Sequence, residues 1–129
     1  MGKRPIKSFV KKGPHYDERV GLAKQLKERM PRIADLLVQG WGNGYVILPP
    51  GHPLYGVEMT HIDLEDFDRP ITFAHYVRDI CWPEVRLEEK DGYVIGFDTM
   101  LNGDTSHNCT EKYVRRETQK LADILEAMW

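Results

Sequence analysis

The chain has 129 residues and a mass of 15.0 kDa, the usual size of a single domain. Its residues are 41% hydrophobic and 29% charged, with a mean hydropathy of -0.51, which excludes a membrane span and predicts a soluble globular protein. The sequence contains two cysteines, Cys81 and Cys109. Because they are far apart and match neither a disulfide scaffold nor a zinc motif, we expect reduced thiols in a cytoplasmic protein.

Positive charge is concentrated in the first quarter of the chain. Residues 1–32 carry ten Lys or Arg and three acidic residues, a net charge of +7. Residues 33–129 carry eight Lys or Arg and seventeen acidic residues, a net charge of -9. The first lysines lie among Pro5, Gly13 and Pro14 without apolar periodicity, which is typical of a solvated terminus. We therefore predict a flexible basic arm over residues 1–13, able to contact nucleic acid through phosphate groups, and one folded domain over residues 14–129.

Two helices are predicted after this arm. Between residues 17 and 30, apolar side chains recur every three or four positions, and Asp17 is a candidate N-cap. These apolar residues are Val20, Ala23, Leu26 and Met30. Pro31 ends the first helix, and a second short helix over residues 33–39 would direct Ile33, Leu36 and Leu37 inward.

Strands are predicted in the middle of the chain. The glycines of residues 40–44 indicate a turn, the apolar run 45–48 predicts a strand, and the proline-rich residues 49–53 predict a rigid loop. Further strands are expected over residues 57–64 and 71–77, with an acidic turn between them. The segment from Glu58 to Asp68 contains five acidic residues and no Lys or Arg. Residues 93–97 are apolar nearly throughout and predict a central strand.

The last predicted element is a helix that begins near Asn108. Glu111 lies three residues later, as in a capping box, and apolar residues mark one face of the helix. They are Val114, Leu121, Leu125 and Met128. The order of helix, helix, several strands and helix predicts an α+β fold with two layers: a mainly antiparallel sheet, N-terminal helices and a C-terminal helix.

A series of short motifs runs from residue 43 to the C-terminus. They are Asn43-Gly44-Tyr45-Val46, Pro50-Gly51-His52-Pro53-Leu54-Tyr55-Gly56, Ile71-Thr72-Phe73, Gly96-Phe97-Asp98-Thr99, Gly103-Asp104 and Tyr113-Val114. In order and spacing, this series resembles a family of small phage and prophage proteins of unassigned function. The resemblance implies a phage or prophage origin and the cytoplasm of a bacterial host, but no activity. Family members tend to have histidines where this chain has Asp68 and Leu101, so any chemistry that depends on those histidines is not expected here.

Three polar residues are candidates for a common site. Asp98 ends a predicted strand, Asp104 follows it closely, and His52 leaves the rigid loop after another strand, so we expect them to converge on one rim of the sheet. Tyr45 and Tyr55 would add aromatic contacts to a ligand or partner. The alternative is that Asp98, Asp104 and His52 only form hydrogen bonds within turns and loops.

The motifs of common enzyme classes are incomplete in this sequence. Met100 stands where a two-metal exonuclease would have its Glu two residues after Asp98, and no phosphate-binding glycine loop or Gly-x-Ser-x-Gly motif is present. His107 and Cys109 are too close in sequence to be a convincing nucleophile pair. We therefore predict no cofactor and no metal site, and we assign no catalytic residue.

The sequence leaves two classes of function open. The first is a phage accessory protein that acts by binding, either inhibiting a host defence protein or sequestering a small polar ligand. In that case the acidic stretch 58–68 would imitate phosphate charge or complement a basic surface. The alternative is a metal-dependent hydrolase of a phosphorylated or nucleotide substrate that uses Asp98, Asp104 and His52. We favour binding, with no membrane partner expected and the oligomeric state left open.

Overall fold

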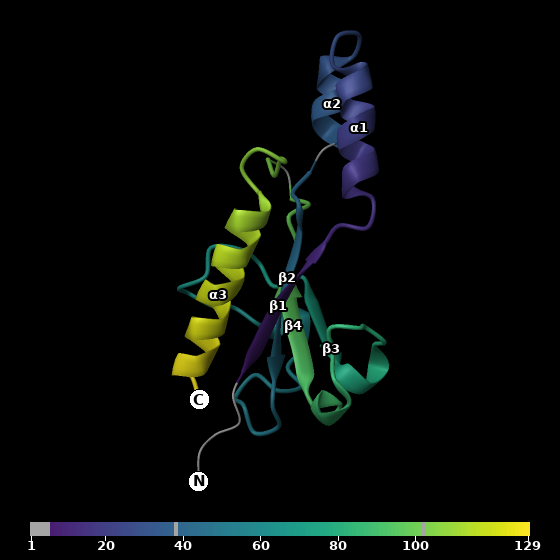
Figure 1. The fold of residues 1–129 in the computed structure, drawn as a ribbon. Coiled ribbons are helices and arrows are strands. Elements are labelled where there is room, and N and C mark those ends of the chain that lie inside the picture. The colour runs from purple at the N-terminus through teal and green to yellow at the C-terminus, as the bar shows by residue number, and fades with distance from the viewer. Residues whose placement is uncertain (1–5, 38, 102) are drawn as a thin grey trace.

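Four strands and three α-helices form the part of the chain that the computed structural model describes, residues 6–37, 39–101 and 103–129 (Figure 1). In chain order they are β1 (Lys7–Lys12), α1 (Tyr16–Leu26), α2 (Pro31–Leu37), β2 (Gly42–Leu48), β3 (Phe73–Tyr76), β4 (Tyr93–Phe97) and α3 (Glu111–Ala127). The strands form one sheet in the order β1-β2-β4-β3, and every neighbouring pair is antiparallel. The predicted α+β fold, with N-terminal helices and a C-terminal helix, is confirmed.

The two faces of the sheet carry different clusters of buried side chains. Alternate residues of β2 and β4, including Val46 and Ile95, face the buried Leu121 and Leu125 of α3. On the other face, Tyr45 and neighbouring residues are covered by residues 77–85. Because the two central strands are covered on both faces, they contain few polar residues. Residues 93–97 are therefore a central strand, as predicted.

The segment predicted as a strand over residues 57–64 is a loop with a short 3-10 turn at Met59–His61. Ile62 of this segment and Phe67 just after it are buried in the core beside α3, while the five acidic residues of 58–68 are exposed. The irregular spacing of its buried residues explains why it forms no regular strand. The predicted strand over residues 71–77 is also shorter than expected, since β3 spans only Phe73–Tyr76.

The basic segment predicted to be flexible instead contains strand β1, which pairs with β2 along its whole length. Phe9 lies on the face covered by residues 77–85, and Val10 lies on the face covered by α3. Lys7 Nζ lies 3.0 Å from a Glu89 carboxylate oxygen, and Lys11 Nζ lies 3.3 Å from one of Glu84. The expectation of a flexible arm is therefore wrong for residues 7–12, because distant acidic residues compensate the lysines and the intervening apolar residues pack.

Helices α1 and α2 form a hairpin that projects from one end of the sheet (Figure 1). No residue of α1 is buried, so the predicted apolar stripe does not enter the main core. Helix α1 ends at Leu26 rather than Met30, and its N-cap is His15 rather than Asp17. In α2, Ala34 is buried and Ile33 is exposed, contrary to its predicted inward position. The expected positions of Leu36 and Leu37 concern side chains outside the described part of the structure.

Helix α3 begins with a different cap from the one predicted. The N-cap is Thr110, whose Oγ1 accepts a hydrogen bond from the Tyr113 N–H at 3.2 Å, while Asn108 lies in the preceding loop. Leu121 and Leu125 are fully buried, as expected, whereas Met128 lies at the exposed C-cap. Within the described residues, no helix is long and apolar enough to cross a membrane.

Candidate functional site

The structure brings together two of the three residues predicted to share a rim. Asp98 and Asp104 follow the C-terminal end of β4 and are linked through Arg69, which donates to the Asp98 backbone oxygen and to the Asp104 carboxylate. His52 lies at the opposite end of the sheet. The reason is that β2 and β4 are antiparallel, with Leu48 opposite Tyr93 and Gly44 opposite Phe97, so the loops after these two strands leave in opposite directions. The predicted convergence of all three residues is wrong.

His52 is a buried residue that connects its loop to the C-terminal helix. Its Nδ1 accepts a hydrogen bond from the Leu54 N–H at 3.1 Å, and its Nε2 lies 2.8 Å from the Leu125 carbonyl oxygen. Because Nδ1 is an acceptor, the ring proton is on Nε2, which donates to Leu125. The imidazole also stacks on Trp129. These contacts support the architectural interpretation of His52 that the sequence left open.

The two predicted tyrosines are also engaged within the fold. Tyr45 is buried on the sheet face away from α3, where its ring packs against Phe9 and Trp82, and burial raises the pKa of its hydroxyl. The hydroxyl of Tyr55 donates to the Asp91 backbone oxygen at 2.6 Å, and its ring packs against two neighbouring tyrosines. Their contacts explain both positions without a ligand.

Arg69, which the sequence analysis did not select, is the centre of a polar cluster. Its guanidinium donates hydrogen bonds to Asp104, to Tyr113 and to the Asp98 backbone oxygen. The side chains of Arg69 and Asp104 are only 9% and 11% exposed, and the nearest atoms of the pair are 2.5 Å apart. Partial burial alone would raise the pKa of Asp104, but hydrogen bonds from Arg69 and the Leu101 N–H outweigh it and hold that pKa below its usual value. A sequence signal existed: Arg69 is the only Lys or Arg between Arg32 and Arg78.

Cys109 borders this cluster as a protonated thiol. Its Sγ donates to Asp104 Oδ1 at 3.4 Å, and burial together with that carboxylate raises the pKa of Cys109 to about 11. A thiol in this state is a poor nucleophile at neutral pH. Among the residues that the structure describes, no group of three His, Cys, Asp or Glu side chains is arranged to hold a metal ion.

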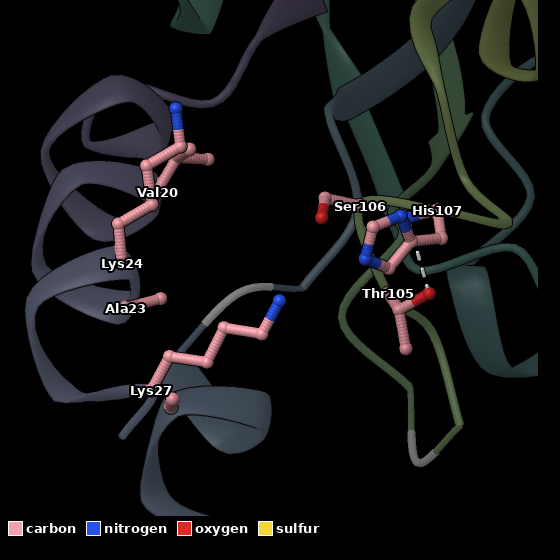
Figure 2. Close-up of a pocket in the computed structure, with 8 residues that line it drawn as sticks. Val20, Ala23, Lys24, Lys27, Thr105, Ser106 and His107 are labelled. Atoms are coloured by element: carbon pink, nitrogen blue, oxygen red, sulfur yellow. Dashed lines mark hydrogen bonds between the residues drawn. The ribbon is translucent and has the colours of Figure 1, made fainter. Parts of the chain in front are cut away.

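A cavity of about 240 Å³ lies between the α1–α2 hairpin and the loop that precedes α3 (Figure 2). It is lined by Val20, Ala23 and Lys24 of α1, by Lys27 at the C-cap of α1, by Ala34 of α2, and by Thr105, Ser106 and His107 of the loop. In Figure 2 the side chain of Lys27 extends from the helix toward Ser106 and His107. The cavity is therefore the place where the basic first quarter of the chain meets the loop after β4.

The helical wall of this cavity follows from the spacing of its residues. Positions 20, 23, 24 and 27 have the spacing of one helix face, so two apolar side chains and Lys24 share one side of α1 with Lys27 at its C-cap. The described ion pairs of lysines involve residues 7, 11, 12 and 120, and Lys24 and Lys27 have none with the described residues. In the sequence, Lys24 and Lys27 lie on the same helix face as Val20 and Ala23. Lysines on an otherwise apolar face were the sequence signal that pointed to this cavity.

The loop wall is held in place by hydrogen bonds of its own side chains. Thr105 Oγ1 accepts from the N–H groups of His107 and Asn108, both at 3.2 Å. The Asn108 side chain accepts from the Thr105 N–H at 2.8 Å and donates to the Gly103 oxygen at 3.0 Å. These bonds fix the backbone that carries Ser106 and the exposed His107 at the mouth of the cavity.

No family model, curated protein or solved structure matches the chain. The resemblance to phage and prophage proteins therefore stays a prediction from the sequence. Chemically, the cavity offers two ammonium groups, two hydroxyls and an imidazole beside small apolar side chains. Such a set is suited to a small molecule that carries an oxyanion and an apolar part.

Proposed function

We propose that the protein acts by binding a small anionic ligand, such as a phosphate ester, in the cavity between α1 and residues 105–107. The observation that carries this proposal is that Lys24, Lys27 and His107 line one cavity, and no carboxylate is among its described lining residues. The ammonium groups attract the anion, and the hydroxyls of Thr105 and Ser106 can donate hydrogen bonds to its oxygens. The adjoining alanine and valine side chains would cover an apolar part of the ligand.

Binding is favoured over hydrolysis because the residues required for hydrolysis are otherwise engaged. Asp104 is paired with Arg69, and His52 lies at the opposite end of the sheet, where it bonds to Leu125. The Asp98 carboxylate accepts the N–H of Met100 within its own turn. None of these groups lines the proposed cavity. A hydrolase using the three predicted residues would require them around one substrate.

The proposed setting is the cytoplasm of a bacterial host, where a phage accessory protein would withhold the ligand from a host defence protein. The sequence resemblance supports the phage setting, and the free thiols of Cys81 and Cys109 suit a reducing compartment. We do not extend the proposal to nucleic acid bound through the N-terminal segment, because Lys7 and Lys11 are paired with Glu89 and Glu84.

Isothermal titration calorimetry with inorganic phosphate, a nucleoside monophosphate and a small dicarboxylate tests this proposal. Lys27→Met keeps an unbranched side chain but removes the charge, so it should weaken binding of the preferred anion by about 1.5–3 kcal/mol, the scale of a charged hydrogen bond. Lys112→Met is the matched control, since Lys112 is exposed on α3 outside the cavity. Equal effects of the two substitutions, or no binding of any of the three anions, would reject the proposal.

A further inference from the structure

A second concave surface, the groove at residues 77–90, lies beside the sheet face opposite α3. Its volume is about 460 Å³. Its lining is apolar at Val77, Ile80, Cys81, Trp82, Val85 and Leu87 and basic at Arg78, Arg86 and Lys90. Among the described residues, none lines both this groove and the cavity at residues 105–107. The groove is thus independent of the ligand site proposed above.

The charge of this groove results from how its segment is attached to β1. Glu84 and Glu89 turn toward the sheet edge, where they pair with Lys11 and Lys7. Arg78, Arg86 and Lys90 remain exposed and form no ion pair with the described residues. The other acidic residues of the segment are exposed but do not line the groove; they are Asp79 and Glu88. The groove therefore presents uncompensated positive charge.

An exposed apolar side chain adjoins these cations. Leu87 is 71% exposed, whereas Met100, the next most exposed large hydrophobic side chain among the described residues, is 50% exposed. Beside it, Trp82 stacks on Phe73 at a centroid distance of 5.1 Å and lies under Lys11 Nζ at 4.3 Å. The indole is thus a fixed wall of the groove whose ring is already engaged. A peptide with an apolar side chain fits this surface better than a nucleic acid base that needs a free aromatic face.

We propose that the groove at residues 77–90 docks an acidic peptide segment of a partner protein. Carboxylates of the partner pair with Arg78, Arg86 and Lys90, and an apolar side chain of the partner packs against Leu87. Charge complementarity selects this partner, because the described lining of the groove includes three cations and no acidic residue. The apolar contact adds affinity that does not depend on salt.

Fluorescence anisotropy of the full chain with a labelled peptide of repeated Glu-Glu-Leu units tests the proposal. Arg78→Glu combined with Lys90→Glu should weaken binding by roughly tenfold or more, since each lost pair is also replaced by repulsion. Leu87→Ser should weaken binding while leaving its salt dependence unchanged. All three residues are exposed, so thermal melting should show intact folding.

Two controls make the outcome decisive. Lys112→Glu gives a single charge reversal on α3, away from the groove, and should leave peptide binding unchanged. A single-stranded oligonucleotide tests the competing polyanion. The proposal is overturned if the peptide does not bind, or if Lys112→Glu weakens binding as much as Arg78→Glu combined with Lys90→Glu. It is also overturned if the oligonucleotide binds more tightly than the peptide and its binding is weakened by the same two substitutions.

Discussion

The guanidinium group of Arg69 joins the carboxylate of Asp104 to the end of strand β4. Its Nη2 lies 2.5 Å from Asp104 Oδ2 and 3.0 Å from the Asp98 backbone oxygen, and its Nη1 lies 3.2 Å from the Tyr113 hydroxyl oxygen. One side chain from the loop before β3 therefore holds the loop after β4 and the first turn of α3. Because that loop continues into residues 105–107, the Arg69–Asp104 pair also positions one wall of the proposed ligand cavity.

Arg69→Met should destabilise the fold by about 2–4 kcal/mol. The substitution leaves the Asp104 carboxylate largely buried without its cation, and breaking a buried pair from one side is costly. Urea unfolding at neutral pH measures the loss. Arg115→Met is the comparison, because Arg115 pairs with Glu111 on an exposed helix face and its loss should cost about 0.5 kcal/mol or less. Similar losses for both variants would show that Arg69 does not organise the loop.

The same pair predicts a specific dependence of stability on pH. The pKa of Asp104 is lower in the folded chain than in the unfolded chain, where it should be near 3.9. Its contribution to stability is therefore complete above the unfolded pKa and is lost as the pH falls through the folded pKa. We expect Asp104→Asn to be less stable than the original chain at pH 7, with a difference that narrows below about pH 4. Urea unfolding at both pH values checks this, and a constant difference would contradict it.

The two cysteines should differ sharply in reactivity. Cys81 is exposed, whereas Cys109 is buried with a pKa raised to about 11. A chromogenic disulfide reagent at pH 8 should therefore label one thiol rapidly and the other only after unfolding. Cys81→Ser should remove the rapid phase. Rapid labelling of the Cys81→Ser variant in its folded state would show that Cys109 is accessible and ionised.

Strand β1 should contribute measurably to stability. Phe9 stacks on Tyr45 at a centroid distance of 5.5 Å and packs edge to face on Trp82, so Phe9→Ala should cost about 1–3 kcal/mol. Deletion of residues 1–12 should destabilise the protein further, because it removes the edge strand and its ion pairs. Thermal melting checks both variants. Unaltered melting on deletion would restore the flexible arm predicted from the sequence.

The sequence predicted elements whose signal is local and missed those that depend on distant partners. The apolar runs of β2 and β4 and the apolar stripe of α3 identified the central strands and the packed helix, because burial on these elements follows a short period. In β1, alternation around Phe9 and Val10 was masked by lysines whose partners, Glu84 and Glu89, lie more than 70 residues away. The sequence analysis therefore predicted a solvated arm from the charge of these lysines, although the segment is a paired strand.

The candidate site was missed for a related reason. His52 and Asp98 each follow a strand, and the sequence does not give the order of strands or the direction in which each loop leaves. Once β2 and β4 are antiparallel neighbours, the two residues are at opposite ends of the sheet. Likewise, Lys27 and His107 become neighbours of one cavity only through the placement of the hairpin against the loop after β4. The sequence shows which polar residues are present, but it does not show which of them the fold brings together.

The last prediction separates architecture from ligand binding at the end of the sheet that carries His52. Leu125 is fully buried, so Leu125→Ala should cost about 2–5 kcal/mol as a large-to-small change in the core. His52→Ala should cost about 1–3 kcal/mol, because the Leu54 N–H loses its partner and the Leu125 oxygen keeps only the Met128 N–H. Met128→Ala, at an exposed position, should have little effect.

None of these three substitutions should alter phosphate binding at the cavity, which lies at the opposite end of the sheet and is lined by other residues. Urea unfolding and calorimetry on the same preparations give both quantities, so stability and affinity can be compared for each variant. If His52→Ala instead weakened phosphate binding without lowering stability, His52 would belong to a ligand site at its own end of the sheet, and the cavity proposed here would not be the phosphate site. We expect His52→Ala to lower the stability of the fold and to leave the affinity for phosphate unchanged, because both ring nitrogens of His52 form hydrogen bonds with backbone groups.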